Sequence, residues 1–140
     1  MGFILFIVAI ILTSILSMAS FVFTPIYYIV TFKWKSGLGQ LDKWFLRLAV
    51  SLDQFGNTSC SKVLEYTMTK RFGVPFGDSD MTVSYVLGRN KYRGSLTLFG
   101  KLIVWILHLI DTNHVEKAIE FQKENDRVAK ERFDSDNYYG

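Results

Sequence analysis

The stretch from Gly2 to Val30, GFILFIVAIILTSILSMASFVFTPIYYIV, decides the architecture of this 140-residue chain. It contains no Lys, Arg, Asp, Glu or His, although the whole chain carries 16 basic and 13 acidic residues. A helix of about 20 apolar residues crosses the hydrocarbon core of a bilayer, and this stretch exceeds that length. We therefore predict a transmembrane anchor over residues 1–32. Pro25 is expected to end or kink its helix, because proline lacks the N–H that a helix needs.

A cleaved signal peptide is the alternative interpretation of the same stretch. Ser17-Met18-Ala19 has the small-x-small pattern of a cleavage site. However, no basic residue precedes the apolar run, and the apolar character continues for about ten residues beyond that site. These two features favour an anchor that is retained.

Positive charge after the anchor predicts its orientation. Lys33, Lys35, Lys43 and Arg47 follow the span closely, and only the amino terminus precedes it. The positive-inside rule then places the N-terminus outside and the rest of the chain in the cytoplasm, at the inner (plasma) membrane. The single cysteine, Cys60, is compatible with a reducing compartment.

The remainder is predicted to be mostly α-helical, with a basic juxtamembrane linker over 33–40, a small helical domain over 41–133 and a flexible tail over 134–140. The linker contains Gly37 and Gly39, Gly56 is expected to end the first helix of the domain, and Asn113 with Glu116 resembles a capping box. Residues 33–101 carry a net charge of +6 and residues 111–140 a net charge of −3. A basic part next to the anchor suits anionic lipid headgroups. The predicted headgroup contacts are Lys33, Lys35, Lys43, Arg47, Arg89, Lys91 and Arg93.

A second apolar stretch, LTLFGKLIVWILHLI, runs from Leu96 to Ile110. Its fifteen residues, with Lys101 and His108 among them, are too few and too polar for a second span. A buried or interfacial helix is the favoured interpretation. If this helix inserted instead, a pore or holin-like function would follow.

Three separated polar motifs are the candidates for chemistry, and they comprise Asp53, Gln54 and Asn57, then Thr82 and Ser84, then Asp111 and His114. A structural network with helix caps is the favoured interpretation, because these residue types satisfy helix ends and each other. A metal site on Asp53, Asp111 and His114 is the first alternative, and an acid–base pair is the second. No residue is assigned as catalytic, and the cofactor stays unknown.

The same motifs, in the order D-Q-x-x-N, T-x-S and D-x-x-H, resemble a family of small, largely uncharacterised phage and prophage proteins. The similarity covers Leu41 to Ile119. It implies a viral or prophage origin, a helical fold and a host membrane, and it implies no established reaction. Some relatives end the last motif with His-Cys, whereas Val115 follows His114 here, which weakens the metal interpretation.

The sequence therefore predicts a membrane-anchored, phage-type accessory protein that acts on the host envelope through protein or lipid contacts. Superinfection exclusion, lysis modulation and assembly tethering are the processes considered. A membrane-tethered metal-dependent hydrolase and a pore are the alternatives. Membrane lipids and a host or viral membrane protein are the expected partners, an oligomer stays open, and nucleic acid is disfavoured because anionic lipid is the simpler partner for an anchored basic domain.

Overall fold

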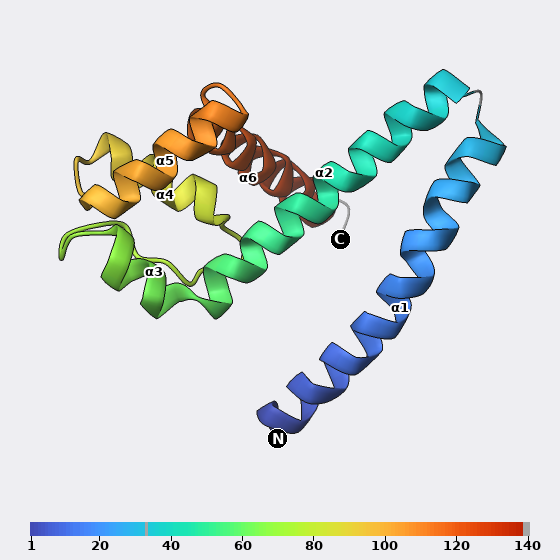
Figure 1. Cartoon of the computed structure of the whole chain (residues 1–140), viewed down its shortest axis with the longest axis horizontal. Helices are drawn as coiled ribbons and strands as arrows, with labels where there is room; N and C mark the ends of the chain where they lie inside the picture. Colours follow the sequence, from blue (N-terminus) through green and yellow to red (C-terminus); the bar gives the residue numbers. More distant parts are fainter. Residues whose placement is uncertain (33, 139–140) are drawn as a thin grey trace. The chain divides into compact units, whose positions relative to one another are not determined.

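The computed structural model describes residues 1–32 and 34–138, and this part of the chain folds into six helices (Figure 1). Within the described residues, one isolated antiparallel β-bridge joins Thr69 and Leu96. The prediction of a mostly helical chain with one long apolar helix at its N-terminus is confirmed. The helices are α1 (Gly2–Thr31), α2 (Trp34–Ser59), α3 (Ser61–Met68), α4 (Val83–Tyr92), α5 (Leu98–Ile110) and α6 (His114–Tyr138).

The chain divides into two compact units, residues 1–48 and 49–140, and α2 contributes to both. In the first unit, α1 is 30 residues long and has no buried residue, and it is long and apolar enough to cross a membrane. The Ser14 hydroxyl donates to the Ile10 carbonyl at 2.7 Å, so this polar group needs no water. The expectation that Pro25 ends the helix is wrong. The helix continues to Thr31, because proline removes only one backbone hydrogen bond.

The linker predicted over 33–40 is helical where the structure describes it, since α2 begins at Trp34. Gly37 is buried, and a Cβ atom there would lie 2.7 Å from the Tyr28 carbonyl oxygen. The absence of a side chain at Gly37 therefore permits the backbone of α2 to approach the end of α1 closely. In the same unit, the Phe21 and Trp44 rings meet edge to face at 5.3 Å.

Three features of the second unit differ from the predictions, namely the end of α2, the end of α6 and the cap at the start of α6. Gly56 does not end α2, which continues to Ser59 because Gly56 keeps a negative φ and the helix remains unstrained. Residues 134–138 continue α6 instead of forming a separate tail. The capping box at the start of α6 does not form, because Asn113 takes a positive φ of 60° and the Glu116 carboxylate contacts Lys91 and His108.

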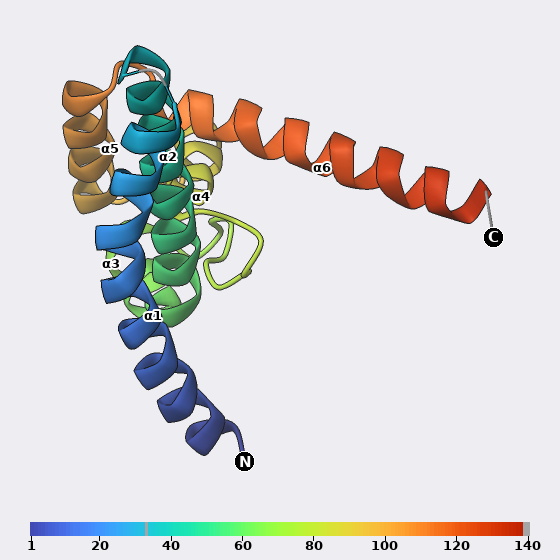
Figure 2. The ribbon, with the colours of Figure 1, turned by 90° about the vertical axis from the view of Figure 1, so that its right-hand side faces the viewer.

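Helix α4 lies at the centre of the second unit. It contacts both α5 and α6, while α3 packs on α5. Val86 and Leu87 of α4 have no exposed surface. The apolar core comprises Phe76, Tyr85, Val86, Leu87, Leu96, Val104, Val115 and Ile119. In Figure 2, α6 extends away from the other helices of this unit.

We expect Gly88→Ala to destabilise the second unit, although alanine is the better helix former. A Cβ at Gly88 would lie 2.8 Å from the Val115 carbonyl oxygen and 2.9 Å from the Ile119 side chain. Overpacking of this kind costs about 1–3 kcal/mol, which outweighs a helix-propensity gain of about 1 kcal/mol. Urea unfolding of the full chain in detergent micelles, followed by circular dichroism, measures the change.

Gly56→Ala is the matched control, because the nearest atom to its Cβ is Val83 Cγ2 at 3.8 Å. This variant should be neutral, or more stable by up to about 1 kcal/mol. Equal effects of the two substitutions would contradict the close approach of α4 and α6.

Candidate functional site

The residues of the three polar motifs are brought together in the second unit, where they form two connected sets of hydrogen bonds. One set holds the loop between α3 and α4, and the other joins α2, α4 and the start of α6. Together they use every residue of the predicted cluster, namely Asp53, Gln54, Asn57, Thr82, Ser84, Asp111 and His114.

Asn57 is the centre of the first set and is fully buried. Its Nδ2 donates to the carbonyls of Asp78 at 2.8 Å and Met81 at 2.9 Å, and its Oδ1 accepts from the Gly77 amide at 3.2 Å. Gln54, nearly one helical turn earlier, donates to the Asp80 carbonyl at 3.2 Å. A loop without regular structure thus has its backbone groups satisfied by two amide side chains of α2.

The same loop leads into α4 through a helix cap. Thr82 is the N-cap residue, and its hydroxyl accepts from the Tyr85 amide at 3.1 Å. Thr82 therefore caps the first turn of α4. An N-cap of this kind stabilises a helix by about 1 kcal/mol.

The second set is a chain of four side chains. Asp53 Oδ2 accepts from the Ser84 amide at 3.3 Å, and Ser84 Oγ lies 3.2 Å from His114 Nε2. His114 Nδ1 lies 3.2 Å from Asp111 Oδ2. A serine hydroxyl, an imidazole and a carboxylate in this order form the arrangement that activates a nucleophile in hydrolases.

The surroundings of Ser84 nevertheless do not suit acyl transfer. Ser84 is only 6% exposed. The amides of Ser84 and Tyr85, which could stabilise an oxyanion at the start of α4, already donate to Asp53 and Thr82. Ser84 and His114 do not line the hollow beside α3 or the hollow beside α5. The geometry therefore links α2, α4 and α6 around a serine hydroxyl that is almost fully buried.

The metal interpretation gains no support from the geometry either. Among the side chains that the structure describes, residues 1–32 and 36–131, no group of three or more His, Cys, Asp or Glu is placed to hold a metal ion. Asp53 accepts from the Ser84 amide, while Asp111 contacts His114 and the ammonium group of Lys117. Lys117 supplies the positive charge beside Asp111 that a metal would otherwise provide.

The electrostatics follow from these contacts. Hydrogen bonds from Lys117 and His114 hold the pKa of Asp111 below its ordinary value. Burial acts to raise the pKa of Glu116, but the hydrogen bond from Lys91 and nearby positive charge lower it overall. Both carboxylates are thus stabilised in their charged forms.

No family model, curated protein or solved structure matches this chain.

The predicted headgroup contacts divide into engaged and exposed side chains. Arg89 is half-buried, donates to the Tyr85 hydroxyl at 2.7 Å and lies over its ring, while Lys91 pairs with Glu116. Exposed side chains are those of Lys43, Arg47 and Arg93. Lys33 and the side chain of Lys35 lie outside the described residues.

Sequence reasoning missed Asn90, which is as deeply buried as Asn57. Its Oδ1 accepts from the Val74 amide at 2.7 Å and the Ser95 hydroxyl at 2.6 Å, and its Nδ2 donates to the carbonyls of Val74 and Val86. The neighbouring residues Arg89, Lys91 and Arg93 were predicted only as headgroup contacts. Only helical spacing from Val86 and Leu87 could have placed Asn90 on the buried side.

We expect Asn57→Ala to lower the free energy of unfolding of the second unit by about 2–3 kcal/mol, because it removes three hydrogen bonds to buried or half-buried backbone groups. Gln54→Ala, which removes one bond at the surface, should cost less than about 1 kcal/mol. Chemical unfolding of both variants in micelles checks the difference. Similar losses would show that Asn57 does not organise the loop.

We expect Asp111 to contribute stability above about pH 4, because its folded pKa lies below its unfolded value. That contribution is lost as the pH falls through the lowered folded pKa. Asp111→Asn should therefore destabilise the unit near neutral pH and have less effect at pH 3, and Lys117→Met should reproduce most of that change. Urea unfolding at both pH values is the measurement. An equal effect of Asp111→Asn at both would exclude this linkage.

Proposed function

We propose that this protein is a membrane-anchored accessory protein of phage type, which acts on the host envelope through contacts with lipids or with a membrane protein. The observation that carries the proposal is α1, an apolar helix of 30 residues without a single buried residue. An apolar surface of that extent is stable in lipid and unfavourable in water. The resemblance of the polar motifs to phage and prophage proteins supports the viral setting.

The proposed topology places the N-terminus outside and the second unit in the cytoplasm. Its support is the positive charge of the exposed Lys43 and Arg47, which follow the span. A cytoplasmic location also agrees with a single cysteine, Cys60, that is exposed and free.

The two alternative functions have less support. The hydrolase requires a metal group that the described residues do not assemble. The pore requires α5 to span, but its 13 residues extend only about 20 Å, against a hydrocarbon core of about 30 Å. The polar network instead gives the second unit a fixed shape, as a binding surface requires.

We expect the full chain to remain in membranes washed with alkaline carbonate, because α1 holds it there. Mass spectrometry of the membrane fraction should find the chain uncleaved after Ala19. A variant lacking residues 2–31 is the control, and a larger share of it should be released. A mature protein that begins near Ser20 and is fully released would overturn the anchor.

Reporters fused after Gly140 test the topology. A fluorescent protein that folds in the cytoplasm should be active, and a phosphatase that requires export should be inactive. Crosslinking followed by purification in detergent should then recover a host or viral membrane protein, or anionic lipid, with the chain. Recovery of the chain without either would contradict the accessory role.

A further inference from the structure

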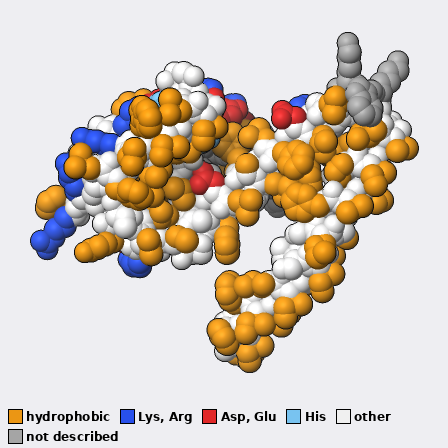
Figure 3. Space-filling view, in the orientation of Figure 1, with side chains coloured by type: hydrophobic (Ala, Val, Ile, Leu, Met, Phe, Trp, Pro, Cys, Tyr) orange, Lys and Arg blue, Asp and Glu red, His pale blue; other side chains and the backbone are white. Residues whose placement is uncertain are grey.

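The outward face of α5 carries seven exposed apolar side chains. Leu98 is 85% exposed and Ile110 is 81% exposed. In the space-filling view of Figure 3, hydrophobic side chains gather over this helix. The exposed apolar residues of the face are Leu98, Phe99, Leu102, Trp105, Ile106, Leu109 and Ile110.

The opposite side of α5 is fixed in the core. Gly100 and Val104 are buried, and a Cβ at Gly100 would lie 2.4 Å from the Met68 carbonyl oxygen. Rotation of α5 would lift Val104 from the core, so the helix cannot hide its outward face within the unit. At about 100° per residue, the seven exposed residues cover one continuous arc of roughly 140°.

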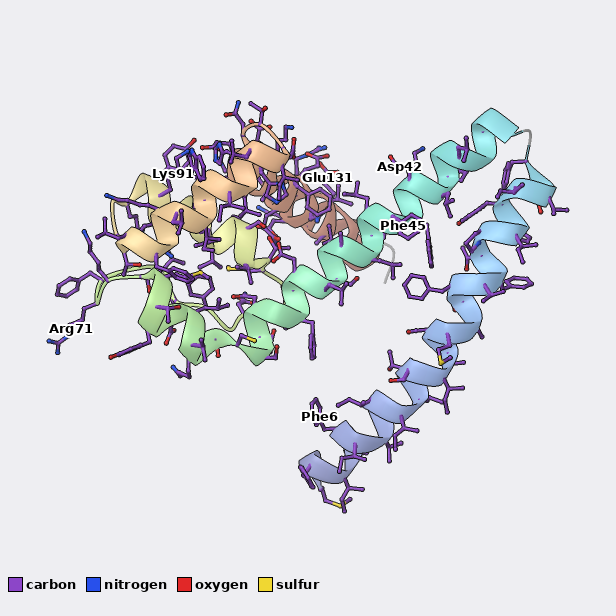
Figure 4. The ribbon with its side chains drawn as sticks, viewed as in Figure 1. Phe6, Asp42, Phe45, Arg71, Lys91 and Glu131 are labelled. Atoms are coloured by element: carbon purple, nitrogen blue, oxygen red, sulfur yellow. The ribbon has the colours of Figure 1, made fainter. Side chains whose placement is uncertain are left out.

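One edge of this arc is basic. Lys101 and His108 are seven residues apart, which places both on the same side of the helix, next to Trp105. With Lys91 of α4, they line a groove of about 420 Å³. The Glu116 carboxylate contacts Lys91 and His108, so Lys101 supplies the positive charge of this edge. Lys91 projects beside α5 in Figure 4, whereas Arg71 lies at the far end of the unit.

We propose that the outward face of α5 lies in the interfacial layer of the bilayer, with Lys101 and the groove beside it at anionic lipid headgroups. The inference deepens the proposed function, since it names the lipid surface as the partner of the second unit. A helix with Leu, Phe and Trp on one face and basic side chains at its margin is the type that lies in the membrane plane. Lys101 can extend its charge to the headgroups while its alkyl stem follows the apolar face.

Charge complementarity favours lipid over a second copy of the chain. Two α5 faces meeting in a symmetric dimer would bring the Lys101 ammonium groups of both copies to one interface. Anionic headgroups neutralise the same margin, and each well-placed basic residue strengthens that attraction. The α1 anchor raises the effective concentration of lipid around the second unit, so a single short helix is sufficient for contact.

Fluorescence of Trp105 in the full chain tests the proposal. Trp34→Phe and Trp44→Phe leave Trp105 as the only tryptophan, and the chain is reconstituted in vesicles of anionic lipid brominated at different depths. We expect the strongest quenching from bromines near the headgroup end of the acyl chains. Lys130→Trp on α6, in a chain that lacks the other tryptophans through Trp34→Phe, Trp44→Phe and Trp105→Phe, is the control. Its fluorescence should stay unquenched.

Two sets of substitutions separate the apolar and the charged contributions. Leu102→Glu with Leu109→Glu should abolish the quenching of Trp105, whereas Phe121→Glu, on α6, should leave it unchanged. All of these side chains are at least 45% exposed, and circular dichroism verifies that the variants fold. In anionic vesicles, Lys101→Gln should lower the ratio of membrane-bound to released α5 about fivefold. In neutral vesicles it should have little effect on that ratio.

Absence of quenching in the parent protein would overturn the proposal, whether crosslinking then reveals a second copy or another protein on α5. Strongest quenching by bromines near the ends of the acyl chains would also overturn it, because α5 would then be inserted across the membrane. Carbonate extraction of the same samples reports on α1 independently. A chain that resists carbonate with an unquenched Trp105 therefore rejects the α5 proposal alone.

Discussion

The burial of α4 is the constraint on which the second unit depends. This ten-residue helix has six buried residues, and Ser84 and Asn90 among them carry polar side chains. A buried polar group without a partner costs several kcal/mol, so the surrounding elements must supply hydrogen bonds as well as apolar contacts. α2 supplies Asp53, α6 supplies His114, and the loop after α3 supplies the backbone of Val74. Hydrogen bonds to Ser84 and Asn90 therefore hold α2, α6 and this loop against α4.

The polar network shows how close a structural arrangement can come to a catalytic one. Its serine, histidine and aspartate are spaced as in a nucleophilic triad, because the same hydrogen-bond lengths serve both purposes. Access and available donors separate the two cases. Here the hydroxyl is enclosed and the amides beside it are already bonded, so the energy of the network stabilises the packing of helices. The exposed surface is then the part of this unit that remains available for a partner.

Two kinds of apolar surface distinguish the helices of this chain. α1 is apolar on all sides, as a helix surrounded by acyl chains is expected to be. α5 is apolar as well, but one side of it contributes Val104 to the core and the other side is exposed. Such a helix packs against the protein core on one side and presents an apolar surface on the other. This arrangement agrees with the proposal that α5 lies between protein and lipid.

The sequence by itself determined the helical class and the apolar N-terminal helix, because these depend on local composition. It also supplied the polar motifs as candidates, without showing that they meet. It did not determine which of the glycines end helices. Gly37 and Gly88 instead permit neighbouring backbones to approach, and Gly56 continues a helix, since a glycine's role depends on what packs against it. The burial of Asn90, the closure of the polar cluster and the exposed face of α5 likewise appear only in the tertiary structure. Each is set by contacts between residues far apart in the chain, and a local pattern carries no information about those contacts.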